Sequence, residues 1–206
     1  AAENSQQWAN LSEVMNYIDA EGVVAENHAD DYVIYAEGIY VGYKYYETRY
    51  EDCVMGRYGA DDAVGSTSGG AWNYAEEMDF TFGAGLSYTT FTHEIQGQPE
   101  IDVTIDSETG APHAFATFNV KVTNTGDVAG KEVVQVYANP PYTKGGIEKA
   151  SANLVGFAKT DLLQPGQSQT VTVDWVAQDM ASYDWNDANA NGYTGYELEA
   201  GDYVIT

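Results

Sequence analysis

The 206-residue sequence predicts a mainly β protein, in which a sandwich of short strands follows a short segment of mixed α and β structure. In the second half of the chain, short runs of alternating apolar and polar residues recur roughly every 8 to 12 residues, with turn sequences between them. In the first half, one run at helical spacing and one long glycine- and serine-rich stretch interrupt this pattern. Short strands at such regular spacing are typical of a β-sandwich of immunoglobulin or fibronectin III type.

The mixed segment occupies the first 80 residues. Helical spacing of apolar residues predicts a helix over residues 11–20, which contain Leu11, Val14, Met15 and Ile18. Alternation from Ile39 to Tyr46 predicts a strand, although the adjoining sequence YKYYETRYEDC could equally start a helix. Residues 56–73 have no periodicity and are rich in Gly, Ser, Asp and Ala, so we expect a long exposed loop.

The sandwich is expected to begin after a compact aromatic and glycine segment, MDFTFGAGLSYTTF. We therefore place the first domain at residues 1–80, a junction at 81–95 and the sandwich at 96–206. The predicted strands cover residues 116–123, 131–138, 154–159, 169–175 and the region around 203–206. Turn sequences separate them, among them NTGD at 124–127 and QPGQS at 164–168.

The charge of the chain excludes several classes of partner. There are 32 acidic residues against 8 basic ones, a formal net charge of −24. Binding to nucleic acid or to an anionic membrane surface needs clustered Lys and Arg, so neither partner is expected. No apolar run is long enough to cross a bilayer.

No nucleophile or acid–base constellation stands out. With so many acidic residues, adjacent carboxylates arise by chance, and we interpret them as solvated surface; the pairs are Asp30-Asp31, Asp61-Asp62 and Glu76-Glu77. The three histidines are isolated and read as surface or turn residues; they are His28, His93 and His113. The single cysteine, Cys53, cannot form an internal disulfide, and the acidic neighbours Glu51 and Asp52 disfavour its thiolate.

One loop has the composition of a calcium site. Asp187, Asn189 and Asn191, followed by Gly192, match the start of an oxygen-ligand calcium loop, to which the Tyr193 carbonyl would contribute the ligand at position 7. The acid expected at position 12 is missing, because Leu198 occupies that position between Glu197 and Glu199. The alternative is an ordinary hairpin loop, in which Asn and Gly supply turn conformations.

Tyrosine is the other excess, with 17 in the chain and a concentration between Tyr32 and Tyr50. Such amphipathic rings line sugar-binding sites, because a ring face stacks on a sugar while the hydroxyl forms hydrogen bonds. They also fill domain interfaces and half-buried sheets, which is the interpretation we favour.

Several stretches in fixed order resemble the C-terminal part of glycoside hydrolase family 3 enzymes, which are mostly β-glucosidases. The stretches are EGIYVGYKYYE (37–47), FTFGAGLSYTTF (80–91), VKVTNTGDVAGKEVVQVY (120–137), LVGFAKTDLLQPGQSQTVTV (154–173) and LEAGDYVI (198–205). The resemblance implies that residues up to about 80 end an α/β sandwich domain and that residues from about 92 to 206 form a fibronectin type III-like domain. Ala84 departs from the family pattern, which has an aromatic residue there.

The resemblance also implies where catalysis takes place. The family nucleophile, an Asp, lies in a separate (β/α)8 barrel, and the acid/base Glu lies upstream of the EGIYVGY stretch, so no catalytic residue is assigned to this chain. The whole enzyme would hydrolyse β-glycosides with retention. It would need no cofactor, and its partners would be a β-linked glycoside substrate and the barrel and α/β domain of the same enzyme. The isolated chain is expected to be inactive; the alternative function is a stand-alone carbohydrate- or protein-binding β-sandwich module.

Overall fold

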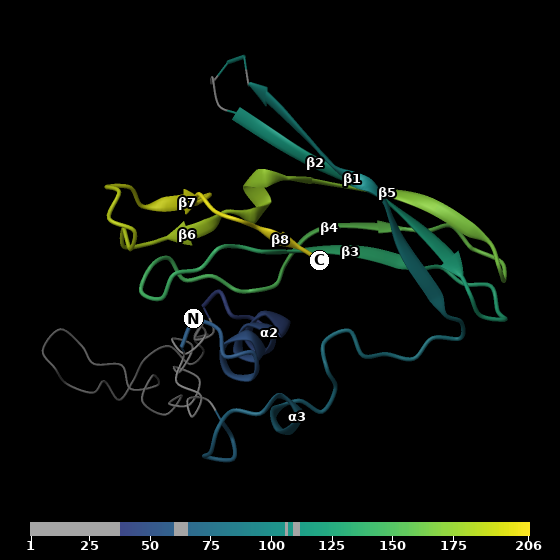
Figure 1. Ribbon diagram of the computed structural model, residues 1–206, viewed down its shortest axis with the longest axis horizontal. Helices are drawn as coiled ribbons and strands as arrows, with labels where there is room; N and C mark the ends of the chain where they lie inside the picture. The colour runs from purple at the N-terminus through teal and green to yellow at the C-terminus, as the bar shows by residue number, and fades with distance from the viewer. Residues whose placement is uncertain (1–37, 60–65, 106, 109–111) are drawn as a thin grey trace, which may run out of the picture. The chain divides into compact units, whose positions relative to one another are not determined.

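The computed structural model describes residues 38–59, 66–105, 107–108 and 112–206, which fall into two compact units (Figure 1). The first unit runs to Phe82 and also contains Tyr142–Ser151. The second consists of Gly83–Pro141 and Ala152–Thr206. The helix predicted at 11–20 lies outside the described residues.

The second unit is an antiparallel β-sandwich, and the prediction of a mainly β fold is confirmed. One sheet has the order β1-β2-β5, formed by Phe91–Ile105, Pro112–Asn124 and Ser168–Val176. The other has the order β4-β3-β8, formed by Asn153–Lys159, Val133–Asn139 and Val204–Ile205. The short 3-10 helix η3 (Ala177–Met180) continues from β5, and a two-stranded ribbon pairs β6 (Ser182–Asp184) with β7 (Gly195–Glu197).

Alternate residues of three strands fill the space between the two sheets. The inward residues of β2, β3 and β5 are buried while their neighbours are more exposed, as the period-two pattern predicts. The members of this core are Ala116, Phe118, Val120, Val122, Val134, Val136, Leu163, Val171, Val173 and Trp175. Phe118 and Trp175 meet edge to face at 5.5 Å between ring centroids. A Cβ on Gly156 of β4 would lie 3.0 Å from Val173 Cγ1, so glycine permits close approach of β4 to β5.

The long strand β1 is a feature that the sequence pattern did not reveal. It pairs with β2 along its length, but the register shifts between Gln96 and Glu100, where the sequence GQP interrupts the alternation. Glycine and proline normally mark the end of a strand. Here they lie within an irregularity of the β1-β2 ladder, and the two strands pair on both sides of it.

The side chain of Asn124 is fully buried at the end of β2 and is the centre of a hydrogen-bond cluster. Its Nδ2 donates to the carbonyls of Val128 (2.8 Å) and Leu163 (2.9 Å). Its Oδ1 accepts from Thr89 Oγ1 (2.7 Å) and from Gly126 N (3.1 Å). Both donors and both acceptor positions of the amide are therefore used.

Two glycines make room for this cluster. A Cβ on Gly126 would lie 2.4 Å from Thr89 Oγ1 and 2.9 Å from Thr90 N. A Cβ on Gly130 would lie 2.7 Å from Thr89 Cγ2. The NTGDVAG and SYTTF sequences are thus packed against each other, and residues larger than glycine would separate them.

In the first unit, the strand predicted from Ile39 to Tyr46 does not form, and residues 43–54 are helical instead. The α-helix α2 (Tyr43–Arg49) continues into the π-helix η2 (Tyr50–Val54), and the separate short helix α3 spans Tyr74–Glu77. Thr48, Arg49 and Asp52 are buried at helical spacing. This buried face is polar, so the sequence has no apolar pattern at helical spacing here. The alternative prediction, a helix that begins in YKYYETRYEDC, is confirmed.

Tyr40 and Thr48 each form a hydrogen bond with the segment Tyr142–Ser151 of this unit. Tyr40 Oη donates to Glu148 Oε2 at 2.5 Å, and burial together with this carboxylate raises the pKa of Tyr40 well above its ordinary value. Thr48 Oγ1 accepts from Ser151 N (3.0 Å) and donates to Lys44 O (2.6 Å). The raised pKa favours the neutral, hydrogen-donating form of Tyr40.

Replacing Asn124 with alanine is expected to destabilise the sandwich by about 3 kcal/mol, because the buried carbonyl of Leu163 and the partly buried carbonyl of Val128 would lose their donor. Urea unfolding of Asn124→Ala against the unsubstituted chain measures this loss. Asn119→Ala is the control: Asn119 is exposed on the same strand and accepts one bond, from Thr172 Oγ1 at 2.7 Å. Asn119→Ala should lower the free energy of unfolding by no more than about 0.5 kcal/mol. Equal losses in the two variants would contradict the role given to Asn124.

Candidate functional site

The predicted calcium loop connects β6 to β7. Gly192 N donates to Asp187 Oδ1 (3.0 Å), Asn191 N to Asn189 Oδ1 (3.3 Å) and Tyr193 N to Asn191 Oδ1 (2.8 Å). Asp187 and Ala190 have positive φ angles of 53° and 57°. The loop therefore folds back through successive side-chain-to-backbone hydrogen bonds, for which Asp, Asn and Gly are suited.

Glu197 is the acid that approaches this loop. The amide Nδ2 atoms of Asn189 and Asn191 donate to Glu197 Oε2 at 3.0 Å and 2.5 Å. Glu197 Oε1 is buried and has no hydrogen-bond partner among the described residues. Leu198, which occupies position 12 of the calcium pattern, lines a cavity with Tyr196 instead. Counting residues along the chain could not identify Glu197, because β7 determines which side chains face the loop.

Asp184 anchors the start of the same loop. Its side chain is buried and accepts hydrogen bonds from Asn186 N (3.1 Å) and Ala188 N (2.8 Å). Burial alone would raise the pKa of Asp184, but the backbone N–H groups that face its carboxylate outweigh it and hold the pKa below its ordinary value. Asp184 thus stays ionised and serves to fix the loop backbone.

The other residues considered from the sequence are not brought together. His93 and His113 lie toward opposite ends of the β1-β2 hairpin, and His93 Nε2 is 3.7 Å from Glu132 Oε1. Glu77 Oε1 accepts from Thr67 N at 2.8 Å. His28, Asp30, Asp31, Asp61 and Asp62 lie outside the described residues.

The described tyrosines between Tyr40 and Tyr50 contact other aromatic rings and a carboxylate. Tyr43 stacks on Phe82 with ring centroids 4.5 Å apart, and Tyr45 meets Tyr46 edge to face at 5.1 Å. Tyr50 packs in the same way on Tyr74, whose hydroxyl donates to Glu47 Oε1 at 2.6 Å. These rings therefore contribute to the packing of the first unit.

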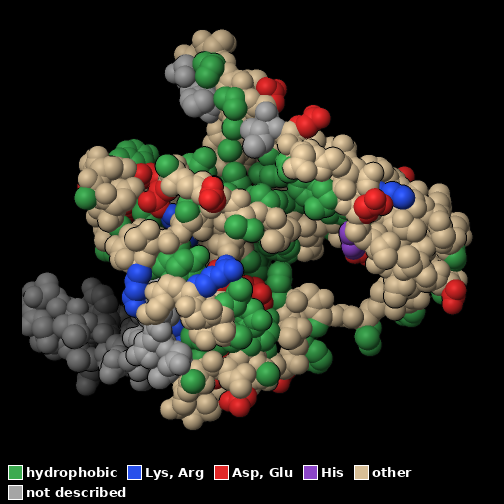
Figure 2. All heavy atoms as spheres, in the orientation of Figure 1, with side chains coloured by type: hydrophobic (Ala, Val, Ile, Leu, Met, Phe, Trp, Pro, Cys, Tyr) green, Lys and Arg blue, Asp and Glu red, His purple; other side chains and the backbone are tan. Residues whose placement is uncertain are grey.

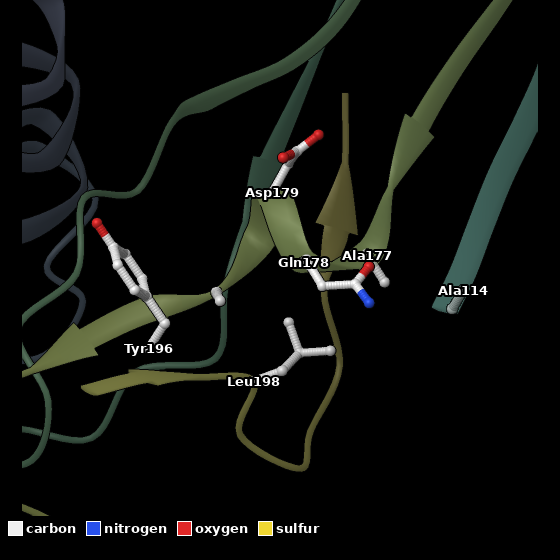
Figure 3. Close-up of a pocket in the computed structure, with 7 residues that line it drawn as sticks. Ala114, Ala177, Gln178, Asp179, Tyr196 and Leu198 are labelled. Atoms are coloured by element: carbon white, nitrogen blue, oxygen red, sulfur yellow. The ribbon is translucent and has the colours of Figure 1, made fainter. Parts of the chain in front are cut away.

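A cavity of about 700 Å³ lies in the second unit beside the β6-β7 ribbon (Figure 3). Its walls are mostly apolar and come from β2, from the segment around η3 and from β7; the lining residues are Ala114, Ala177, Gln178, Asp179, Ala181, Tyr196 and Leu198. Figure 3 shows Tyr196 at one end, Ala114 at the other, and Leu198 facing Gln178 between them. No sequence pattern predicted this site, since its walls come from three separate segments.

Charge, metal-ligand groups and hydropathy add three observations on the described part of the chain. Figure 2 shows acidic side chains scattered over the visible face rather than gathered in one patch. No group of three or more His, Cys, Asp or Glu side chains there could hold a metal ion, and no helix is long and apolar enough to span a membrane.

Comparison with known proteins identifies the relatives of this chain. A fibronectin type III-like domain matches residues 132–206. Over 84% of its length the chain is 40% identical to β-glucosidase A of Butyrivibrio fibrisolvens, and over 87% it is 34% identical to an exo-α-(1→6)-L-arabinopyranosidase of Bifidobacterium breve. A crystal structure of a β-glucosidase from Paenibacillus barengoltzii covers 81% of the chain with a TM-score of 0.55 and 36% identity.

The match covers only a small share of each relative. The chain spans 18% of the Butyrivibrio enzyme, 17% of the Bifidobacterium enzyme and 14% of the Paenibacillus chain. The relatives are therefore much larger proteins, and the alignment assigns this chain to one segment of them. The resemblance drawn from the sequence is confirmed: this chain is homologous to a segment of glycoside hydrolase family 3 β-glucosidases and contains a fibronectin type III-like domain.

Proposed function

We propose that this chain is the accessory, non-catalytic segment of a retaining β-glycosidase, most simply a β-glucosidase, whose nucleophile and acid/base lie in other domains of the same enzyme. The observation that carries the proposal is homology over more than four-fifths of this chain to less than a fifth of each relative. The residues of the shared motifs support it, because Asn124, Gly126 and Gly130 serve packing and hydrogen bonding in the sandwich.

Substrate choice belongs to the rest of the enzyme in this proposal. Relatives named for a β-glucosidase and for an exo-α-(1→6)-L-arabinopyranosidase share the segment at 40% and 34% identity. A segment that serves two such different glycosidases would hold the enzyme together rather than select the sugar.

The junction supplies a surface for the other domains. In the second unit, Tyr88 is 96% exposed and Leu86 is fully exposed. In a complete folded protein, large apolar side chains so close in sequence rarely all stay exposed to water. In the proposed enzyme they would be covered by the catalytic domains.

The isolated 206-residue chain should not hydrolyse p-nitrophenyl β-D-glucoside, whereas a chimera in which it replaces the matching segment of the Butyrivibrio enzyme should do so. The physical reason is that a retaining mechanism needs two carboxyl groups about 5 to 5.5 Å apart, and both would come from the remainder. Release of p-nitrophenol measures the activity. Sustained turnover by the isolated chain would overturn the proposal, as would an inactive but folded chimera.

Replacing both Leu86 and Tyr88 with serine should change the melting temperature of the isolated chain by no more than about 2 °C, since exposed side chains contribute little to its stability. In the chimera, the same double substitution should lower the melting temperature or the activity, because the contacts with the catalytic domains would be lost. Thr92→Ser, an exposed position on β1, is the control. Indifference of the chimera to the double substitution would show that the junction does not dock.

We also propose calcium binding by the Asp187 loop, with oxygen ligands from Asp187, Asn189, Asn191 and Glu197. The position of Glu197 supports it, because its carboxylate lies within hydrogen-bond distance of both Asn189 and Asn191. On binding, both amides would turn Oδ1, in place of Nδ2, toward the ion. Carboxylate and amide oxygens are the ligands that calcium prefers.

Calcium at about 100 times its Kd should stabilise the chain by about 2.7 kcal/mol, since a ligand of the folded state stabilises it. The measurement is the melting temperature in calcium, in magnesium and after addition of EDTA. Glu197→Gln should remove the calcium-dependent shift. A melting temperature that millimolar calcium leaves unchanged would refute the site.

A further inference from the structure

We propose that the cavity beside the β6-β7 ribbon, with the aromatic face of the ribbon, binds a neutral β-linked glucan chain. Tyr183 and Tyr196 are directly opposite each other in the ribbon, with ring centroids 5.0 Å apart and planes at 70°. They are 52% and 73% exposed. Tyr196 also lines the cavity, so the exposed ring pair continues into a recessed apolar surface.

The two sides of the ribbon have different roles. Asp184 and Glu197 lie in register with Gly195 and Ser182, and their carboxylates hold the connecting loop. Because successive residues of a strand point to opposite sides, Tyr183 and Tyr196 are left on the other side. The loop hydrogen bonds thus fix the ribbon that carries the two rings, which reduces the entropy lost when a ligand binds.

The chemistry of the cavity fits a saccharide. Tyr196, Leu198 and the alanines provide an apolar surface for the C–H faces of sugar rings, while the exposed Gln178 and Asp179 offer hydrogen-bonding groups for hydroxyls. A volume of about 700 Å³ lies within the usual range for ligand sites.

Charge decides between classes of ligand. Asp179 lines the cavity, none of the lining residues is Lys or Arg, and the whole chain carries a formal charge of −24. A polyanion such as a uronic-acid polymer would be repelled, whereas an uncharged glucan would not. The choice of a β-linked glucan rests on the proposed function, since binding a β-glucan would keep substrate close to a β-glucosidase.

Isothermal titration of the 206-residue chain with cellotetraose tests the site, and gel electrophoresis through soluble β-glucan provides a second readout. We expect saturable binding of cellotetraose and retardation in the gel. Tyr196→Ala should weaken binding about threefold to tenfold, the effect of losing one aromatic contact. Tyr196→Phe should retain most of it, because the ring remains. Tyr88→Ala, which removes an even more exposed ring from the junction, should bind as the unsubstituted chain does.

Circular dichroism confirms that each variant is folded. Absence of saturable binding, or equal binding by Tyr196→Ala and the unsubstituted chain, would overturn the inference. Preferential binding of a lysine-rich peptide, abolished by salt, would overturn it in favour of a basic protein partner. None of these results would affect activity of the chimera, so failure of the glucan site and failure of the proposed function are distinguishable.

Discussion

The sandwich depends on the buried amide of Asn124. The Asn124 side chain donates two hydrogen bonds and accepts two, which connect the junction at Thr89, the turn that contains Gly126 and Val128, and Leu163. Backbone bonds add to this connection, because Asn124 N donates to Gln167 O and Gly166 N donates to Asn124 O. A buried amide is costly when any of its partners is lost, so the positions of the junction and of both turns are coupled.

That coupling explains why these stretches resemble a family so clearly. Asn124 has to carry both donors and acceptors, and Gly126 and Gly130 have to lack a Cβ, because Thr89 and Thr90 lie within contact distance. Motifs of this kind reflect the geometry of a fold rather than a reaction. They identify relatives, but they carry no information about the reaction that those relatives catalyse.

The sequence predicted those parts of the fold in which burial follows an apolar pattern. Ala116, Phe118, Val120 and Val122 alternate in the sequence and are buried in the core. In α2 the buried side chains are Thr48 and Arg49, which no hydrophobic period would select. Strand β1 was missed because Gly97 and Pro99 interrupt its alternation. At the candidate sites, Asp187, Asn189 and Asn191 could be named from their spacing, but Glu197 and the cavity around Tyr196 depend on the pairing of β6 with β7.

The segment Tyr142–Ser151 leaves the sandwich between β3 and β4 and belongs to the first unit. The polypeptide therefore passes between the two units three times, after Phe82, after Pro141 and after Ser151. No single proteolytic cut can release either unit as one continuous chain. A fragment restricted to the matched residues 132–206 would lack β1, β2 and Asn124. The domain that sequence comparison recognises is thus smaller than the sandwich in the structure, and we expect the segment to be expressed or exchanged only as a whole.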